Sequence, residues 1–411
     1  MPGPNHAIAL VTPWFGDDET NGSQLLSSQL VGELFAANER VDVLTTCAKS
    51  FHDGWSSNYH AEGTTRFDSF TLRRFRVRER DTAAFNWANA FLLSQPTDFL
   101  KKHPGAIPAG VADAFCGENI HSPGLLQYLA DWGRTYASII FTPYPYGPVL
   151  HGLQRVSDRA FLQPCLHDEP YAYLPQTARI FRAARGLLFN SRAEYDLACE
   201  LYGEAIRAKS TIVGHWVNAP ELRPLSDPVV PKGRYVFYLG RICDSKNVRA
   251  VVNAFHDYRR YRPASQLQLV LAGDGEPLPA GNGVHFLGRV NERRKQALLQ
   301  CCAALFQPSV NESFSRSVME AWSYSKPVAV NGRCAPTAGA VNECGGGWLA
   351  SSAYDWIGAL RAIDDASAES LRALGERGKS YYLLRGTPER VLERYREALG
   401  LDRRAVAAAR G

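Results

Sequence analysis

Short apolar runs alternate with helical stretches along most of the 411-residue chain. Each run ends in glycine, proline or polar residues, which is typical of strands buried on both faces of a parallel sheet. Parallel strands need long crossover connections, and helices usually provide them. The alternation therefore predicts doubly wound α/β domains. Strands are expected at 7–11, 41–45, 70–77, 137–141, 161–166, 186–189, 210–213, 235–239, 267–271, 284–287, 303–306 and 326–330.

The length of the chain points to more than one folding unit. A single hydrophobic core rarely grows beyond about 250–300 residues, so a chain of 411 residues predicts two domains. Prolines are dense between 220 and 231, which indicates a boundary there. We predict two Rossmann-like domains, an N-terminal one over 1–219 and a C-terminal one over 220–383.

The composition excludes several classes of protein. Apolar residues make up 45% of the chain and charged residues 21%, as in ordinary globular proteins. A net charge of +5 is too small to indicate nucleic-acid binding, although it suits phosphorylated ligands or an anionic membrane surface. The nine cysteines show neither a CxxC pair nor zinc spacing. With no leader-like start and no run of 18 apolar residues, we expect a cytoplasmic protein with reduced thiols and at most peripheral contact with the inner membrane.

The most informative stretch runs from 305 to 330, where a strand, an acidic loop, a helix and another strand follow one another. The helix is expected to begin near Ser315, Arg316 and Ser317, where unpaired backbone N–H groups and the helix dipole favour a phosphate. Glu312 precedes this anion site and Glu320 follows it. An alternative is that Ser317 and Glu320 form a capping box and that Glu312 is an ordinary loop acid.

A second strand-to-helix turn carries basic residues. Gly240 and Arg241 follow the strand at 235–239, and Lys246 precedes a helix whose apolar residues have a helical period. Such turns are common sites for anions.

In the first domain, the strand at 7–11 leads to an acidic cluster at 17–19 and to Gly22, which opens a helix reaching about residue 37.

Two further strand ends in the first domain carry polar residues. Tyr144 and Tyr146 follow the strand at 137–141, while His167, Asp168 and Glu169 follow the strand at 161–166. The carboxyl ends of parallel strands face the ligand site in this fold class. The charged triplet could be a structural turn, a metal site or a ligand contact.

Residues 50–135 are the least informative part of the chain. The strand at 70–77 alternates apolar and basic residues, which favours an edge strand with a solvated basic face over a contact with lipid phosphates. His121 lies in a loop over 117–124 that could touch a ligand or cap a helix.

Two patterns together resemble a known family. Glu312 and Glu320 are separated by seven residues, with Phe314 between them, and Gly240-Arg241 precedes Lys246 by the spacing of a diphosphate-binding loop. The chain therefore resembles the retaining glycosyltransferases of family 4 (glycosyltransferase group 1), which have the GT-B fold. It departs from the family pattern at Ser315, where glycine is usual, and at Arg316, where an aliphatic residue is usual.

The resemblance implies roles for most of these residues. Glu312 would lie against the donor sugar, Glu320 would bind the ribose hydroxyls, and Arg241 and Lys246 would bind the diphosphate. The remaining donor contacts are expected from the small loop and the strand ends: Gly22, Gly288, Arg289, Val290, Ser315, Arg316 and Ser317. The two domains would face each other across a cleft.

For the N-terminal domain, the resemblance implies that His167 and Asp168 act with Glu312 as catalytic residues. His121 and Tyr144 are expected to contact the acceptor, although members of the family place a histidine where this chain has Tyr144. In the C-terminal part, residues 345–349 resemble a glycine-rich hairpin. The last helix, within 384–411, is expected to return to the N-terminal domain.

The expected activity is transfer of a mannosyl- or glucosyl-like unit, with retention, from a GDP- or UDP-linked sugar to a hydroxyl of a saccharide or lipid-linked saccharide. The setting would be bacterial polysaccharide, lipopolysaccharide or glycolipid synthesis. The chain has no Gly-x-Gly-x-x-Gly, Walker A or Asp-x-Asp pattern, so we expect no NAD, no P-loop and no metal or other cofactor. A nucleotide-sugar 2-epimerase of the same fold and a non-catalytic GT-B regulator remain alternatives.

Overall fold

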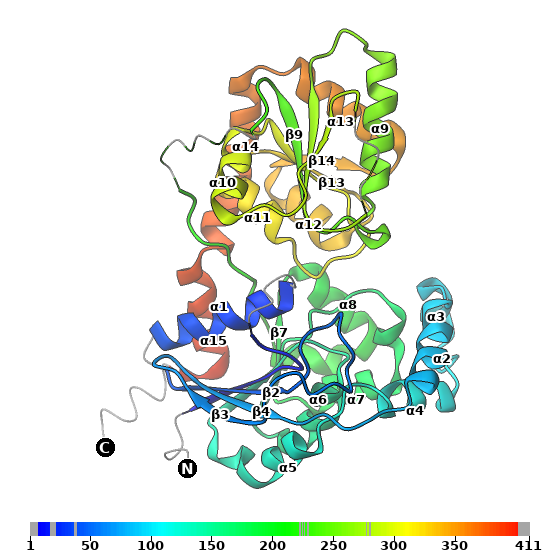
Figure 1. The fold of residues 1–411 in the computed structure, drawn as a ribbon, viewed down its shortest axis with the longest axis vertical. Helices are drawn as coiled ribbons and strands as arrows, with labels where there is room; N and C mark the ends of the chain where they lie inside the picture. Colours follow the sequence, from blue (N-terminus) through cyan, green and yellow to red (C-terminus); the bar gives the residue numbers. More distant parts are fainter. Residues whose placement is uncertain are drawn as a thin grey trace. The chain divides into compact units, whose positions relative to one another are not determined.

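The computed structural model describes residues 7–16, 22–36, 39–276, 278 and 281–401, except 222, 224, 226, 228 and 229. It divides into two compact units (Figure 1). The first comprises Met1–Val213 with Leu392–Gly411, and the second comprises Gly214–Val391. The acidic cluster at 17–19 lies outside the described residues.

The first unit is built on an eight-stranded sheet of order β3-β4-β2-β1-β5-β6-β7-β8. All neighbours are parallel except β3 and β4. The strands are β1 (Ile8–Val11), β2 (Val41–Thr46), β3 (Gly63–Arg66), β4 (Thr71–Phe75), β5 (Ser138–Phe141), β6 (Ala160–Leu162), β7 (Gly186–Phe189) and β8 (Ser210–Ile212). The order reverses between β1 and β5, as in a doubly wound sheet.

Helices provide the crossovers of the first unit. They are α1 (Gly22–Ala36), α2 (Thr82–Leu93), α3 (Thr97–Lys102), α4 (Ala109–Gly117), α5 (Pro123–Trp132), α6 (Gly147–Gly152), α7 (Pro175–Ala183) and α8 (Arg192–Tyr202), with short 3₁₀ turns at 133–135, 153–156, 170–173 and 204–209. The last helix, α15 (Pro388–Leu399), joins this unit from Leu392 onward. Its Tyr395 is fully buried, and its Arg396 lies 3.7 Å from Glu39.

The second unit has a six-stranded, all-parallel sheet of order β11-β10-β9-β12-β13-β14. The strands are β9 (Tyr235–Leu239), β10 (Gln268–Ala272), β11 (Val284–Phe286), β12 (Ala304–Gln307), β13 (Val328–Asn331) and β14 (Gly347–Ala350). The helices are α9 (Val248–Tyr261), α10 (Glu292–Cys301), α11 (Arg316–Ser323), α12 (Ala335–Cys344), α13 (Ala353–Asp365) and α14 (Ala368–Arg385), and a 3₁₀ turn covers 244–246. Here the order reverses between β9 and β12.

Both faces of the second sheet are covered, which explains the continuous apolar runs of its strands. Alternate residues of β9 point to opposite cores: Val236 packs with Phe255 of α9, and Phe237 packs with Trp322 of α11. Close packing requires glycine on α14, since a Cβ at Gly378 would lie 2.0 Å from the Trp322 ring. The predicted fold class of two doubly wound α/β domains is confirmed.

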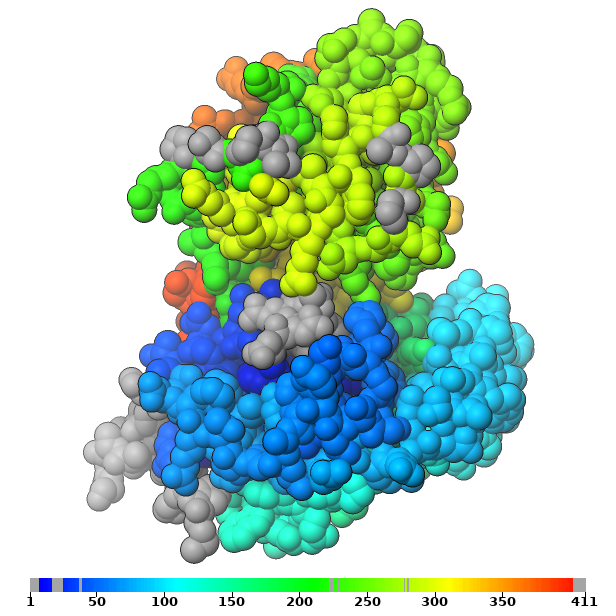
Figure 2. Space-filling view, in the orientation of Figure 1, coloured from blue at the N-terminus to red at the C-terminus, as the bar shows by residue number. Residues whose placement is uncertain are grey.

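The structure corrects the prediction for residues 50–135. This segment forms α2 to α5 and the additional strand β3, and it makes up much of the visible surface of its unit in Figure 2. The strand β4 lies between β2 and β3, so the prediction of an edge strand was wrong. Its basic residues are used internally: Arg73 pairs with Asp42 at 3.3 Å, and Arg74 donates to the Phe15 carbonyl at 2.7 Å.

Two smaller predictions also fail. Residues 345–349 do not form a hairpin, because Gly345 ends α12 in the left-handed conformation and β14 then pairs in parallel with β13. The strand predicted at 161–166 ends at Leu162. Among the described residues, no helix is long and apolar enough to span a membrane.

Candidate functional site

The reversal of strand order between β9 and β12 identifies the candidate site of the second unit. Doubly wound sheets bind ligands beyond the carboxyl ends of the strands at such a switch point. The chain leaves β9 through residues 240–247 and leaves β12 through residues 308–315. These are the two segments that the sequence had already marked.

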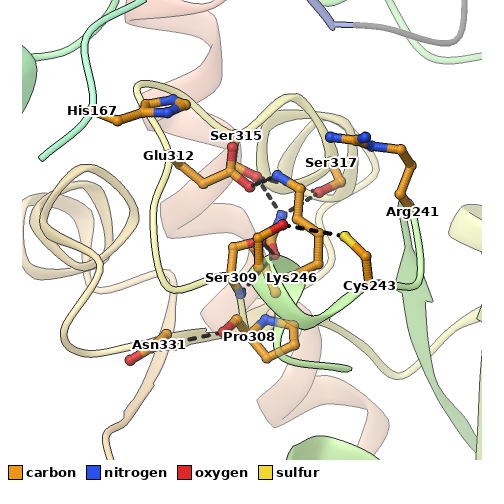
Figure 3. Close-up of polar contacts among 12 residues, drawn as sticks. His167, Arg241, Cys243, Lys246, Pro308, Ser309, Glu312, Ser315, Ser317 and Asn331 are labelled. Carbon is orange, nitrogen blue, oxygen red and sulfur yellow. Dashed lines mark hydrogen bonds and ion pairs between the residues drawn. The ribbon is translucent and has the colours of Figure 1, made fainter. Parts of the chain in front are cut away.

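Backbone contacts fix the loop after β9. Gly240 N–H donates to the Ala272 carbonyl at 3.0 Å, and Ile242 N–H donates to the Asp274 carbonyl at 2.7 Å. A Cβ at Gly273 would lie 1.8 Å from the Gly240 carbonyl oxygen, so this close approach requires glycine. The loop is therefore held against the loop after β10. It presents the exposed side chain of Arg241 (Figure 3).

Lys246 and Glu312 join the two loops. The Lys246 Nζ lies 2.5 Å from the Glu312 Oε1, and the two side chains point toward one another in Figure 3. Only 22% of the Lys246 side chain and 12% of the Glu312 side chain are exposed. Glu312 is therefore not an ordinary loop acid on the surface, because it accepts a charge-assisted hydrogen bond with little solvent around it. The structure thus brings together two residues that lie 66 positions apart in sequence.

A buried polar cluster supports the loop after β12. Gln307, the last residue of the strand, donates from Nε2 to the hydroxyls of Ser315 at 3.1 Å and Ser317 at 3.2 Å. Its Oε1 accepts from the Ser309 hydroxyl at 2.8 Å. The sequence reasoning missed Gln307, although an amide at the end of an otherwise apolar strand was a usable signal. The cluster therefore fixes both ends of the loop that carries Glu312.

Glu320 does not form the alternative capping box. The helix α11 begins at Arg316 with Ser315 as its N-cap residue, so Glu320 lies in the second turn, and the Ser315 side chain makes no capping bond. The Glu320 carboxylate instead accepts from Lys295 Nζ at 2.8 Å, and only 13% of its side chain is exposed. Burial lowers the pKa of Lys295, but the carboxylates of Glu320 and Glu292 outweigh burial and raise it overall.

Lys295 is a second residue that the sequence did not reveal. It lies on α10, and the residues around it in the sequence do not indicate that its side chain contacts α11. The candidate site therefore contains two partly buried lysine–glutamate pairs.

Arg316 turns toward the chain that precedes β9. Its Nη1 donates to the Trp216 carbonyl at 3.0 Å and lies 3.3 Å from the His215 Nδ1. Burial lowers the pKa of the Arg316 guanidinium, and burial together with Arg316 lowers the pKa of His215 well below its usual value. The expected contact of Arg316 with a donor remains a prediction.

The residues expected near the nucleobase lie at the same edge of the sheet. Gly288, Arg289 and Val290 follow β11, and the Gly288 carbonyl accepts from Gly273 N–H at 2.9 Å. Arg289 is exposed. Asn291 caps α10 by accepting from Arg294 N–H, as predicted.

In the first unit, the polar residues after β6 have separate partners. Asp168 accepts from the Tyr173 hydroxyl at 2.7 Å and pairs with Lys101 at 3.1 Å. His167 Nδ1 lies 3.9 Å from Glu169. In the described ranges, no three histidine, cysteine, aspartate or glutamate side chains gather where they could hold a metal ion.

Tyr144 is buried, and its hydroxyl is used within the protein. It donates to Glu169 Oε1 at 2.7 Å, and burial together with this carboxylate raises the pKa of Tyr144 well above its usual value. Tyr144 therefore has no exposed hydroxyl with which to contact an acceptor, and its predicted role in acceptor binding stays a prediction.

Glu194 positions the loop that carries His167. Its fully buried carboxylate accepts from Leu166 N–H at 2.6 Å and from Asn190 N–H at 2.5 Å. Burial raises the pKa of Glu194 to about 8, against the lowering effect of these hydrogen bonds. The pattern Ser191-x-x-Glu194 was the signal that could have identified it.

Two expected residues of the first unit lie elsewhere. Gly22 opens α1. His121 stands beside His151, with ring centroids 5.2 Å apart, and burial, His151 and nearby arginines lower the pKa of His121 to about 4. The roles predicted for these residues remain predictions.

Comparison with solved structures defines the fold class. The chain is similar to sucrose-phosphate synthase from Thermosynechococcus elongatus, with 17% identity and a TM-score of 0.67 over 98% of this chain and 100% of that chain. The corresponding values for α,α-trehalose 6-phosphate synthase from Burkholderia multivorans are 13%, 0.70, 99% and 100%. Those for Anabaena HepE, solved in complex with UDP and glucose, are 15%, 0.63, 96% and 99%. These similarities show that the chain has the GT-B fold.

A family match adds to the fold. Residues 233–363 match the family described as Glycosyl transferases group 1. This segment contains Arg241, Lys246, Glu312 and Glu320. No curated protein sequence matches the chain significantly. The match and the fold together support a GT-B glycosyltransferase.

Proposed function

We propose that this protein transfers a hexosyl unit from a nucleotide diphosphate sugar to a hydroxyl acceptor with retention of configuration. The observation that carries the proposal is the Lys246–Glu312 pair at the switch point, next to the start of α11. Both residues lie in the segment matched by the glycosyltransferase family. This arrangement can stabilise a leaving nucleotide diphosphate.

The leaving diphosphate gains negative charge as the sugar departs, and fixed positive charge stabilises it. Lys246 has three N–H donors, so it can bind a phosphate oxygen while one donor remains on Glu312. Arg241 offers a planar fork for a second phosphate oxygen. The first N–H groups of α11 add the positive end of a helix dipole.

The two glutamates take different parts of the donor. Glu312, oriented by Lys246, would accept hydrogen bonds from the sugar hydroxyls and keep the anomeric carbon in position. Glu320 would accept from the two ribose hydroxyls, and the ion pair with Lys295 would hold its carboxylate in place. Backbone groups at 288–290 would hold the base.

Known complexes support the class of donor. The Anabaena HepE structure contains UDP and glucose, and a similar Escherichia coli structure is bound with UDP-2-fluoro glucose. We propose a UDP- or GDP-linked hexose as donor and a saccharide or lipid-linked saccharide as acceptor. His167 and Asp168 would act on the acceptor side, and a bacterial polysaccharide or glycolipid would be the product.

A donor panel with and without acceptor tests the proposal. The protein is incubated with UDP- and GDP-hexoses, and free nucleoside diphosphate and sugar products are measured. A transferase releases the diphosphate rapidly only when an acceptor is present. Conversion of the sugar without acceptor would indicate an epimerase, and absence of both reactions across the panel would leave only a binding role.

A further inference from the structure

A cavity in the second unit lies at the edge of the sheet opposite the candidate donor site. Its volume is about 540 Å³. It is lined by Arg234, Ala303 and Pro327, which directly precede β9, β12 and β13. Because all strands of this sheet are parallel, their amino ends lie at the edge away from Lys246 and Glu312. The cavity is therefore a separate site.

The charged residues of the cavity lining are mostly basic. Among the described residues that line it, four side chains are cationic, Arg234, Lys326, Arg372 and Lys379, and one is a carboxylate, Glu376. Glu376 lies 3.8 Å from Arg372, so its charge is shared within α14. Arg234 is committed to the end of α13, where its Nη1 donates to three backbone carbonyls at 2.8–2.9 Å.

Two lysines are left to face the cavity. Within the part of the chain that the structure describes, no carboxylate pairs with the ammonium group of Lys326 or of Lys379. Lys326 comes from the connection between α11 and β13, and Lys379 comes from α14. Two cations from different elements thus line one cavity, and neither is paired with a carboxylate of the described residues.

The wall that carries Lys379 is held rigidly. The α14 residues that line the cavity are spaced by about one helical turn, at Ala368, Arg372, Glu376 and Lys379, so they share one face. The same helix packs backbone to backbone on the connection before Lys326, since a Cβ at Gly375 would lie 1.9 Å from the Ser325 carbonyl oxygen. The backbone segments that carry the two lysines are consequently packed against each other.

We propose that this cavity binds a small phosphorylated molecule. A volume of about 540 Å³ falls within the range of roughly 300–1,000 Å³ typical of small-molecule sites. Lysine ammonium groups bind phosphate through charge-assisted hydrogen bonds, and an anion would give both lysines a charged partner. The bound phosphoryl group would lie between Lys326 and Lys379, and the organic part would occupy the rest of the cavity.

Cysteine protection tests the proposal with pyrophosphate as the probe. Cys301 lines the cavity and is exposed, whereas Cys243, also exposed, lies in the loop after β9. Alkylation by iodoacetamide is followed at each cysteine by peptide mass spectrometry. Pyrophosphate should slow the alkylation of Cys301. A nucleoside diphosphate should slow the alkylation of Cys243.

Two matched double variants locate the effect. Lys326→Gln/Lys379→Gln should require at least ~10-fold more pyrophosphate to protect Cys301, because two charge-assisted contacts are lost. Its Cys243 should react and be protected as in the wild type, which shows that the variant is folded. Lys102→Gln/Lys232→Gln removes the same charge from exposed positions and should leave Cys301 protection unchanged. Equal protection of Cys301 in both double variants, or none in the wild type at millimolar pyrophosphate, would overturn the proposal.

Discussion

Replacing Lys246 with alanine removes the ammonium group at the centre of the candidate donor site. In the structure this group is 2.5 Å from Glu312, and only 22% of the lysine side chain is exposed. A hydrogen bond to a charged group contributes roughly 1.5–3 kcal/mol, which corresponds to a roughly 10- to 150-fold change in affinity. We expect Lys246→Ala to weaken nucleoside diphosphate binding within this range.

The neighbouring basic residue should behave in the same direction but more weakly. Arg241 is exposed, so solvent already screens its charge, and Arg241→Ala should lie near the lower end of the range. Leaving Glu312 without its partner costs on the order of 1–3 kcal/mol of stability in Lys246→Ala, and Glu312→Gln in the same background should restore most of it.

Titration calorimetry with UDP and GDP measures these affinities, and thermal unfolding measures stability. Lys232→Ala is the matched control, since Lys232 is an exposed lysine of the same unit and should bind as the wild type does. If both Lys246→Ala and Arg241→Ala bind nucleoside diphosphates with wild-type affinity, the assignment of the phosphate site is wrong.

The remaining predictions concern ribose binding, pH and metal. Glu320→Gln should lower nucleotide affinity without lowering the melting temperature much, because Lys295 loses only one of its two carboxylate partners and keeps Glu292. Unchanged affinity would refute ribose binding by Glu320. The depressed pKa of His121, about 4 against an ordinary value near 6.5, means that its neutral form stabilises the fold above pH 6.5 and that this contribution is lost as the pH falls toward 4. His121→Gln should therefore lose less stability than the wild type between pH 6.5 and 4. His103→Gln, at an exposed histidine, is the control, and equal losses in the wild type and His121→Gln would contradict the prediction. Turnover should persist in excess EDTA because Arg241, Lys246 and the start of α11 provide the positive charge; full loss restored by manganese would show that a metal ion does so.

Much of the fold could be predicted from the sequence because its strands are buried on both faces. The run Tyr235–Leu239 is apolar throughout and coincides with β9. The capping residue Asn291 likewise marked the start of α10. Residues 50–135 defeated the same reasoning, since helices such as α3, with six residues, are too short to show a clear period.

The candidate site was predictable only where a motif lies within one segment. Glu312 and Glu320 are eight positions apart, and their segment carries a recognisable pattern. Their partners come from elsewhere: Lys246 was suggested by its own turn, but its bond to Glu312 required the sheet topology. Lys295 could not have been found, because nothing on α10 indicates which face meets α11.

The central claim is that the switch point of the second unit binds a nucleotide diphosphate. Hydrogen exchange measured with and without UDP or GDP tests this claim directly, with the nucleoside alone as the control. Residues 240–247 and 308–320 should be more strongly protected with UDP or GDP, and the increase should depend on the diphosphate. Protection confined to other segments, or identical exchange with and without either diphosphate at saturating concentration, would contradict it.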